Sequence, residues 1–528
     1  MYKVNQIKVK VDQDRKEFPR LIAKKLNLRV NDIKNVKLIK RSIDARNKDN
    51  VHYSCSFSFE ISIDEQVFLS KVPHKLITKI EERQPLTLYK TNKKIIIVGA
   101  GPSGLFTALL LLKAGNQVII IERGEDVDKR KESVESFFET AVLNPDSNIQ
   151  FGEGGAGTFS DGKLTTSINN PLIQDILEIF VSAGAPEEIL YEAKPHIGTD
   201  YLVTVVKNLR KQIIDLGGTI LFETKLVDIV MNENKLKAIK VKNKDTILEV
   251  YLDALVLAIG HSARDTYEML YKHNIEMQQK TFAVGIRIEH PQDFINVSQY
   301  GEKFKHKLGA ADYKLAYHTK DNRGVYTFCM CPGGYVVASS SEEGHLVVNG
   351  MSEFARDGKN ANSAILVNIF PSDFSSDDPL EGILFQRDLE RKAFLLGGSD
   401  YSAPISLLKD YMENTFSAKL EDVIPTYRPR TRFVNINHIF PDFINTALKE
   451  GIESFNRKID GFNMDNAVIT GVESRSSSPL RIVRDEHFET NIKGVYPIGE
   501  GAGYAGGITS SCLDGLKFAL DFMKVNMD

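Results

Sequence analysis

The stretch VGAGPSG at 98–104 constrains the fold of this chain more strongly than any other feature, because its glycines follow the G-x-G-x-x-G pattern of a dinucleotide-binding turn. The apolar run at 95–98 predicts a buried parallel strand. Residues 105–113 predict a helix packed on the sheet, and 118–121 predict a second strand that ends at Glu122. This complete βαβ unit predicts a Rossmann-like α/β domain.

Each residue type in the turn has a physical role. Gly99 permits the tight turn, Gly101 lets the backbone approach a pyrophosphate, and Gly104 lets the helix and strand pack closely. The helix N-terminus directs a partial positive charge at the phosphates. Glu122 can accept hydrogen bonds from both ribose hydroxyls of an adenosine and would repel a 2′-phosphate. The tightly bound nucleotide is therefore not expected to be NADP.

Two further strands are expected to pass the nucleotide. The strand predicted at 225–230 would place the backbone of Val227 beside an adenine edge. The apolar strand within 252–264 ends in small residues, Ala258 and Gly260, which let the chain run close to a cofactor. Together with the C-terminal segment, these strands favour FAD over NAD.

The C-terminal segment is expected to bring a second helix N-terminus to the same cofactor, because strand 495–498 leads through a glycine-rich turn into a helix from about Gly507. Glu500 would bind ribityl hydroxyls, and amides near Gly507 and Ile508 would meet the flavin ring. The predicted cofactor-binding residues are Gly99, Gly101, Pro102, Ser103, Gly104, Glu122, Arg123, Arg130, Gly155, Gly157, Thr158, Lys163, Val227, Ala258, Gly260, Gly499, Glu500, Gly507 and Ile508.

Longer motifs along the chain carry a family resemblance. They are RSIDAR (41–46), QFGEGGAGTFSDGKLTT (150–166), HIGTD (196–200), VYTFCMCPGGYVV (325–337), NGMSEFAR (349–356), TGVESRSSSPLRIVRD (470–485) and IGEGAGYAGGI (498–508). The nucleotide motifs resemble the two-dinucleotide-binding-domain flavoproteins of the glutathione-reductase superfold. The whole chain resembles one branch of them, the FAD-dependent dehydrogenases called "NAD(FAD)-utilizing dehydrogenases". The resemblance implies bound FAD and a cytosolic oxidoreductase, and it implies no particular substrate.

Charge separates the N-terminal part of the chain from the rest. Residues 1–94 hold 22 Lys and Arg against 11 Asp and Glu, a net charge of +11, whereas the remainder holds 45 against 59, a net charge of −14. Residues 51–62 alternate between apolar and polar, which predicts a half-buried strand. We expect a basic α+β, ferredoxin-like β-α-β-β module over 1–92.

The other domains follow from the order of the motifs. The FAD-binding domain is expected to occupy 93–280 and 465–528. A substrate domain inserted at 281–464 would cover the flavin, first strand-rich and then helical, with helices at 405–416 and 443–455.

The positive charge of the N-terminal module has two interpretations. The module could bind RNA or another polyanion. Alternatively, it could dock onto its own acidic body, which the buried position of its aromatic residues favours. The sequence leaves both interpretations open, and it does not indicate an oligomeric state.

Four polar residues are candidates for chemistry. Lys163 could stabilise negative charge on a reduced flavin, or it could form a salt bridge to Asp161. His196 could be a general acid, or it could order a loop. Arg287 and Arg475 could each bind a substrate carboxylate, and each also has acidic residues nearby that could pair with it.

The four cysteines do not form a disulfide framework, which fits a reducing cytoplasm. Cys329 and Cys331 alternate within a predicted strand, so their side chains should stand parallel, which favours packing over a redox pair. No metal site is expected. The N-terminus has no signal-peptide pattern, and the longest aliphatic run is too short to span a membrane.

These features predict an FAD-dependent oxidoreductase that transfers a hydride between flavin N5 and a small-molecule substrate. No second dinucleotide-binding unit is present in the sequence, so NADH or NADPH would have to reach the flavin transiently as an electron donor. Three alternatives stay open: an RNA-modifying flavoprotein that uses the basic module, a flavin monooxygenase, and a non-catalytic FAD protein.

Overall fold

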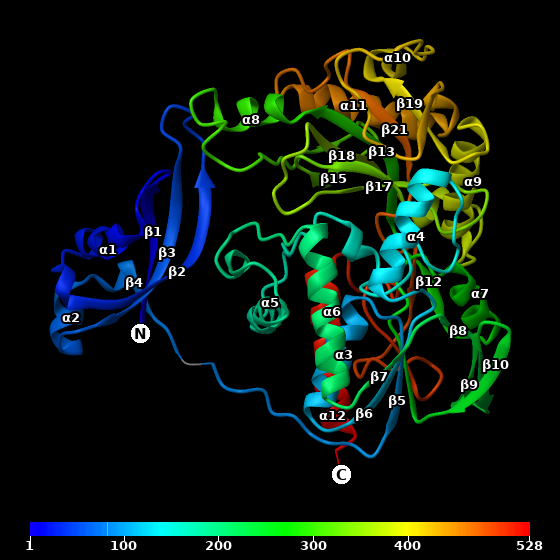
Figure 1. The fold of residues 1–528 in the computed structure, drawn as a ribbon, viewed down its shortest axis with the longest axis horizontal. Helices are drawn as coiled ribbons and strands as arrows, with labels where there is room; N and C mark the ends of the chain where they lie inside the picture. The colour runs from blue at the N-terminus through cyan, green and yellow to red at the C-terminus, as the bar shows by residue number, and fades with distance from the viewer. Residues whose placement is uncertain (82, 528) are drawn as a thin grey trace.

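The N-terminal lobe is a four-stranded antiparallel sheet with two helices on one face, and it lies at one side of the molecule in the computed structural model (Figure 1). The structure describes residues 1–81 and 83–527. The elements of this lobe are β1 (Tyr2–Lys10), α1 (Phe18–Leu26), β2 (Ile33–Asp44), β3 (His52–Ile61), α2 (Glu65–Lys71) and β4 (Ile77–Lys79). This β-α-β-β-α-β order is ferredoxin-like. The predicted β-α-β-β unit is therefore confirmed, and it continues through α2 and β4.

The core of the lobe is centred on β3, in which apolar and polar residues alternate along the sequence. Phe57 and Phe59 on β3 are fully buried, and they pack with Phe68 of α2 and Ile22 of α1. Ser56 and Ser58 alternate with these phenylalanines and pair with lysines of the neighbouring strands, so the opposite face of the sheet is polar. The alternation of β3 thus sets one apolar and one polar face for the whole sheet.

A parallel five-stranded sheet forms the centre of the second lobe. Its order is β23 (Val495–Pro497), β11 (Ala254–Leu257), β5 (Lys94–Val98), β6 (Gln117–Ile121) and β7 (Thr219–Leu221). Helix α3 (Pro102–Lys113) is covered by the sheet, by α6 (Thr199–Asp215) and by α12 (Ile508–Val525), as Figure 1 shows. Because α3 is enclosed on all sides, it is apolar all round. The predicted Rossmann-like fold is confirmed.

Smaller elements complete the nucleotide-binding lobe. An antiparallel sheet joins β8 (Thr224–Asn232), β9 (Lys235–Asn243) and β10 (Thr246–Tyr251). The pair β12 (Met277–Gln279) and β22 (Leu480–Ile482) is antiparallel. The additional helices are α4 (Val127–Thr140), α5 (Leu172–Ser182) and α7 (Arg264–Lys272).

A mixed seven-stranded sheet forms the third layer, above the parallel sheet in Figure 1. Its order is β14 (Ala316–His318), β15 (Gly324–Cys331), β18 (Asn360–Ile369), β13 (Phe282–Pro291), β21 (Val468–Glu473), β19 (Ser402–Leu407) and β20 (Arg430–Phe433). A two-stranded ribbon, β16 (Tyr335–Ala338) and β17 (Val348–Met351), lies against it. The helices of this layer are α8 (Gln292–Tyr300), α9 (Glu381–Leu396), α10 (Leu408–Met412) and α11 (Asp442–Asn456).

The helix predicted at 405–416 is wrong in its first part. Strand β19 ends at Leu407, and only a short helix, α10, follows it. The run of β19 is buried throughout because it pairs with β20 and β21, and a short apolar run alone does not separate a buried strand from a helix. The helix predicted at 443–455 is confirmed as α11.

Strand β21 belongs to the large sheet although it follows residue 464, where the sequence suggested a return to the FAD-binding domain. It pairs with β13 along five residues and with β19 on its other side. The chain rejoins the parallel sheet only at β23. The two layers therefore share one continuous C-terminal segment.

Candidate functional site

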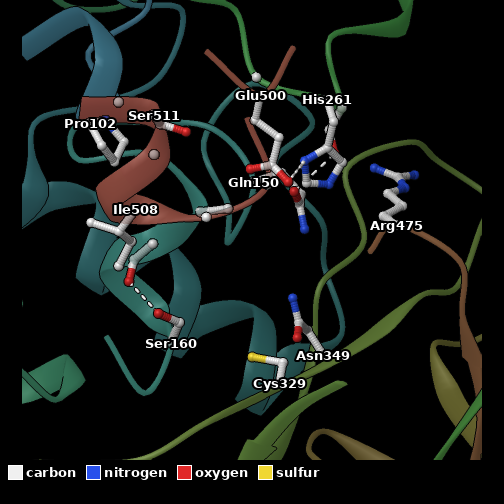
Figure 2. Close-up of a pocket in the computed structure, with 18 of the residues that line it drawn as sticks. Pro102, Gln150, Ser160, His261, Cys329, Asn349, Arg475, Glu500, Ile508 and Ser511 are labelled. Carbon is white, nitrogen blue, oxygen red and sulfur yellow. Dashed lines mark hydrogen bonds and ion pairs between the residues drawn. The ribbon is translucent and has the colours of Figure 1, made fainter. Parts of the chain in front are cut away.

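A cavity of about 560 Å³ lies where the carboxyl ends of the parallel strands meet the large sheet. Ligands of open α/β sheets bind at this end of the strands. Figure 2 shows Pro102 of the glycine turn beside Ile508 and Ser511 of α12, with Cys329 and Asn349 on the strands across the cavity. The cavity therefore has one wall from the nucleotide-binding lobe and one from the large sheet.

The three glycines of the turn differ in what a side chain would meet. A Cβ at Gly99 would lie 2.3 Å from the carbonyl oxygen of Ala258, and Gly99 has a φ of +106°. A Cβ at Gly104 would lie 2.0 Å from the carbonyl oxygen of Gly99. A Cβ at Gly101 would have only the Cα of Gly155 nearby, at 3.8 Å. Gly99 and Gly104 are thus required for packing, whereas Gly101 leaves room for a ligand.

Glu122 and Arg130 organise the loop that follows the second strand. The Glu122 carboxylate accepts hydrogen bonds from the backbone N–H groups of Ala100 (2.8 Å), Gly124 (3.0 Å) and Gly152 (3.0 Å), and Glu122 lines the cavity. The buried Arg130 guanidinium donates to the backbone carbonyls of Asn148, Ile149, Gly152, Glu153 and Gly155. Arg130 therefore shapes the glycine-rich loop from behind and does not reach the cavity.

Two helix N-termini point at the cavity. Gly101 precedes α3, and Gly507 precedes α12, whose first residue Ile508 lines the cavity. A Cβ at Gly506 would have open space around it, and one at Gly507 would meet only the Ser510 hydroxyl at 4.0 Å. Two positive helix ends and a cradle without side chains suit the diphosphate and ring system of a dinucleotide.

The structure brings most of the predicted cofactor residues to one cavity. Those that line it are Gly99, Gly101, Pro102, Ser103, Glu122, Arg123, Gly155, Gly157, Lys163, Ala258, Gly260, Glu500, Gly507 and Ile508. Those that do not line it are Gly104, Arg130, Thr158, Val227 and Gly499. Strand β8 contributes Thr224 and Leu226 in place of Val227, which lies at a break in the β8–β9 register.

Lys163 lines the cavity but forms the salt bridge that the sequence allowed as an alternative. Its Nζ lies 2.9 Å from Asp161 Oδ2 and also donates to the carbonyl oxygen of Met330. Arg356 binds the same carboxylate through two hydrogen bonds of 2.8 and 2.6 Å. Burial opposes ionisation of Asp161, but these two cations hold its pKa well below its usual range, and Asp161 in turn raises the pKa of Lys163.

His196 lies outside the cavity lining, and its surroundings favour a loop-ordering role. Its ring stacks on Phe354 with centroids 5.2 Å apart, and Nε2 lies 3.1 Å from the Phe354 carbonyl oxygen. Burial, together with the positive charge of Arg356, lowers the pKa of His196 to about 4. The imidazole is therefore neutral at neutral pH, and Nε2 can donate to the carbonyl as one tautomer.

Arg287 is fully buried in β13 and does not line the cavity. Its guanidinium pairs with Glu473 through hydrogen bonds of 2.6 and 3.0 Å, and it donates to Asn362 and Asn349. Glu473 and Asn349 do line the cavity. Arg287 therefore positions two residues of the wall.

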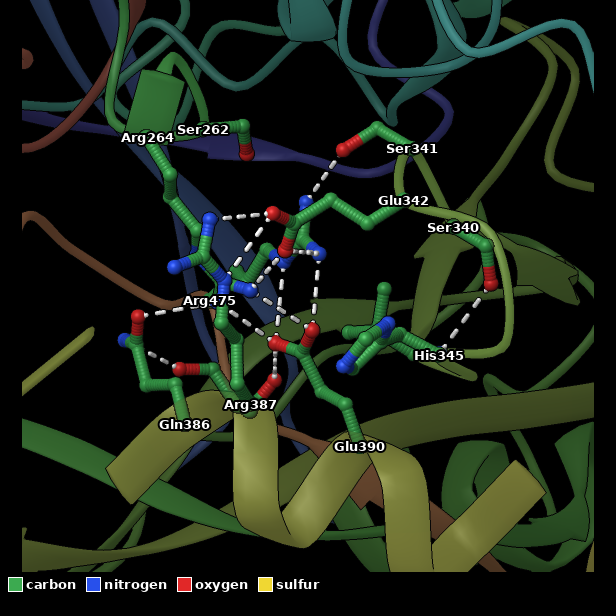
Figure 3. A network of polar contacts seen from close by, with 12 residues as sticks. Ser262, Arg264, Ser340, Ser341, Glu342, His345, Gln386, Arg387, Glu390 and Arg475 are labelled. Carbon is green, nitrogen blue, oxygen red and sulfur yellow. Dashed lines mark hydrogen bonds and ion pairs between the residues drawn. The ribbon is translucent and has the colours of Figure 1, made fainter. Parts of the chain in front are cut away.

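Arg475 lines the cavity at the edge of a buried ionic network (Figure 3). It donates to Glu390 through two hydrogen bonds of 2.9 and 2.7 Å and to the Ser341 hydroxyl. Arg264 of α7 binds the other side of the same carboxylate at 2.7 and 2.9 Å. This network joins the nucleotide-binding lobe to α9, so Arg475 is a structural residue as well as a lining residue.

Sequence reasoning missed Cys329 as a lining residue. The β15–β18 register shifts between Phe328 and Cys331, and Cys329 adopts a φ of +40° in this bulge. The two thiols therefore do not stand parallel as predicted. A hydrogen bond from Cys331, helped by the charges of Lys163 and Arg287, lowers the pKa of the Cys329 thiol. No sequence pattern indicates the bulge.

His261 and Glu500 form a second pair of polar residues at the cavity, of which the sequence indicated only Glu500. His261 Nδ1 lies 3.7 Å from Glu500 Oε1, and both residues line the cavity beside Gln150 (Figure 2).

Within residues 1–81 and 83–527, no group of three or more metal-ligating side chains comes together, and no helix is long and apolar enough to cross a membrane.

Comparison with known proteins identifies the cofactor. Residues 92–133 match the family described as FAD binding domain, and residues 281–476 match the family described as FAD-dependent protein, C-terminal domain-like. Residues 1–60 match a domain of unknown function. The glycine turn and the large sheet therefore belong to an FAD-dependent flavoprotein, and the cavity between them suits FAD.

Two solved structures are similar to this chain at low identity and low TM-score. A flavin-dependent brominase is 12% identical, with a TM-score of 0.37 over 83% of this chain and 82% of that chain. A geranylgeranyl bacteriochlorophyll reductase-like protein from Thermoplasma acidophilum is 11% identical, with a TM-score of 0.36 over 83% and 79%.

A relative matches this chain from end to end. An uncharacterized protein from Clostridium beijerinckii is 49% identical over 525 residues, which are 98% of this chain and 97% of that protein. Identity at this level and length shows common ancestry for all the layers described above. The chain belongs to one family with this clostridial protein, and its own matched domains are those of an FAD-dependent flavoprotein.

Proposed function

We propose that this protein is an FAD-dependent oxidoreductase that transfers a hydride between the cofactor and a polar small molecule. The observation that carries the proposal is the continuity of the cavity, in which the dinucleotide turn and a wall of polar side chains from the large sheet face the same space. When bound, FAD supplies the hydride chemistry, and the protein supplies binding, orientation and electrostatics.

On the nucleotide wall, backbone groups would hold the cofactor. The α3 N-terminus and the space left by Gly101 would take the diphosphate, and Glu122 would accept from the ribose with the lone pairs that its three backbone donors leave free. Glu500 and the α12 N-terminus would hold the remainder of the cofactor.

On the opposite wall, side chains would hold the substrate. Cys329, Asn349 and Glu473 offer a thiol, an amide and a carboxylate to the cavity. Arg287 fixes the last two by charge-assisted hydrogen bonds from behind the wall. Lys163 keeps a positive charge at the cavity surface beside Asp161. This wall would orient a polar substrate and keep it from rotating.

Anaerobic reduction of the purified holoprotein tests the proposal. NADH, NADPH and a panel of polar metabolites are added in turn while the visible spectrum of the cofactor is recorded. We expect at least one of these donors to bleach the oxidised spectrum, and Asn349→Ala to slow that bleaching without loss of FAD. Asn463→Ala, at an exposed position, is the matched control. A cofactor that stays oxidised with every donor would favour a non-catalytic FAD protein.

A further inference from the structure

The polar face of the N-terminal sheet carries a group of lysines that the cavity chemistry does not use. Directly paired residues of neighbouring strands point to the same face. Ser58 pairs with Lys3 and Lys37, while Ser56 pairs with Lys40. Ser54, Glu60 and His52 pair in the same way with the remaining lysines of the group. We call this surface the lysine face, and its members are Lys3, Lys8, Lys10, Lys34, Lys37 and Lys40.

The lysines of the lysine face are not used in ion pairs with the described residues. Five of its lysines are exposed and Lys3 is half-buried, and none of the six has an ionic partner among the described residues. Of the acidic residues on this face, Asp44 is paired with Arg46, and Glu60 accepts a hydrogen bond from Asn35. The face therefore presents an uncompensated positive charge to solvent.

Docking of the lobe onto its own body uses arginines instead. Arg41 forms an ion pair with Glu192, and Arg83, just after the lobe, reaches Asp175 and Glu178. These contacts account for part of the charge complementarity between the two halves of the sequence. They leave the lysine face open.

A backbone connection links the strand next to the lysine face to the edge of the cavity. The Arg41 N–H, one residue after Lys40, donates to the Tyr191 carbonyl at 2.6 Å, and the Ala193 N–H donates back to Arg41 at 2.8 Å. The next residue, Lys194, lines the cavity, as does Lys314, and both are exposed. Lys194 is paired with Asp312 at 2.7 Å, so this connection reaches the edge of the cavity but adds no free positive charge through Lys194.

We propose that the lysine face binds the phosphate backbone of a single RNA strand. Six lysines on one sheet supply a sequence-independent electrostatic footprint. The hydroxyl of the half-buried Ser54 lies between them and can bond phosphate or ribose oxygens, whereas Ser56 and Ser58 are buried. Among the paired residues of this face there is no Phe, Tyr or Trp for base stacking, and the imidazole of His52 lies against the Asn50 carbonyl. These strands present no helix that could enter a DNA major groove and no exposed apolar side chain among the paired residues of this face that could insert into a lipid surface.

Fluorescence anisotropy of a labelled 20-nucleotide uridine RNA tests this proposal on the full-length holoprotein. We expect salt-sensitive binding that weakens at least about tenfold in the triple variant K8E/K37E/K40E. Removal of three phosphate contacts should also reduce the slope of log K against log salt by about 2, at about 0.7 per contact on single strands. The matched control K211E/K272E/K524E reverses three exposed lysines on the nucleotide-binding lobe. Its affinity for the RNA should stay within about twofold of the wild type, because exposed substitutions away from a binding surface have small effects.

Three results would overturn the proposal. They are no RNA binding by the wild type at low salt, equal loss in the two triple variants, or binding to phosphatidylglycerol vesicles or to the matching DNA strand at least as tight as binding to RNA. The visible spectrum of each sample reports FAD content. Failure of RNA binding can therefore be told apart from failure of the oxidoreductase proposal, on which this inference does not depend.

Discussion

The two walls of the cavity are built in different ways. The nucleotide wall consists mainly of backbone, with glycines at 99, 101, 155 and 157 and two helix N-termini. The wall from the large sheet consists of side chains, and buried ion pairs such as Arg287–Glu473 and Arg475–Glu390 hold them in place. A wall of backbone groups suits a cofactor that stays the same from one reaction cycle to the next. A wall of side chains can be altered by substitution to suit a particular substrate.

The difference also separates two kinds of stability. The glycine turn depends on local backbone geometry, which a single substitution can block without unfolding the sheet. The side-chain wall depends on charges that have been removed from water, where loss of one partner leaves another uncompensated. The predictions below test these two kinds of stability with separate substitutions.

The largest effect is expected from Glu390→Ala on α9, in the ionic network behind the side-chain wall. The fully buried Glu390 carboxylate is shared by Arg264 and Arg475, so its removal leaves two buried guanidinium groups with Glu342 as their remaining acidic partner. Loss of one member of a buried ion pair costs about 3–5 kcal/mol. Urea denaturation should show this loss, while the nearby exposed Glu343→Ala should be almost neutral. A loss below about 1 kcal/mol would mean that the network does not stabilise this wall.

Gly101→Val should damage the nucleotide wall alone. The branched side chain would enter the space that Gly101 leaves open, so FAD content should fall at least about tenfold, a difference of about 1.4 kcal/mol in binding. The urea midpoint of the apoprotein should stay close to that of the wild type. Gly309→Ala, where a Cβ meets nothing within 4 Å, should keep its FAD.

A yellow Gly101→Val protein with normal FAD content would contradict the assignment of this turn. Gly104→Val sharpens the comparison, because its Cβ would clash with the Gly99 carbonyl at 2.0 Å and should prevent folding itself.

Cys329 should be the most reactive thiol of the protein. The other three cysteines are buried, and the pKa of Cys329 is lowered by Cys331 and by neighbouring positive charge. Because a lowered pKa places more thiolate at neutral pH, alkylation should reach half its maximal rate below the value of about 8.5 that an ordinary thiol shows. Peptide mass spectrometry after a short iodoacetamide pulse at a series of pH values measures this. Labelling of Cys55 or Cys512 before Cys329 would contradict this prediction and would mean that the reagent does not reach Cys329 in the cavity.

Lys163→Ala should have the smallest effect. Asp161 keeps its second cation, Arg356, so folding and FAD retention should change little. Loss of a positive charge at the cavity should make the midpoint potential of the bound cofactor more negative by about 30 mV, which corresponds to about 1.4 kcal/mol for two electrons. Potentiometric titration of the two holoproteins measures the shift. An unchanged midpoint potential would contradict this prediction and would mean that Lys163 acts only through its salt bridge to Asp161.

More of the backbone wall than of the side-chain wall could be predicted from the sequence. The glycine turn and Glu122 could be located from the sequence, because a tight turn and a close phosphate approach require particular residue types at fixed spacing. Arg287 could be picked out as a charged residue in an apolar strand. Its partner Glu473, however, lies 186 residues away, and only the pairing of β13 with β21 brings the two together.

Other features depend on tertiary structure in ways that local patterns do not record. The bulge that turns Cys329 toward the cavity arises from the register of β15 on β18. The apolar run at 402–407 becomes a strand because β20 and β21 flank it. The lysine face could be anticipated as charge, but only the strand register shows that its six lysines share one side of the sheet.

The visible spectrum of the purified protein, followed by release and chromatography of its cofactor, tests the central claim most directly. We predict the absorption bands of an oxidised flavin and the release of about one FAD per chain, in accord with a single dinucleotide-binding unit. A colourless protein that does not bind added FAD, or one that releases FMN, would contradict the assignment of the cavity.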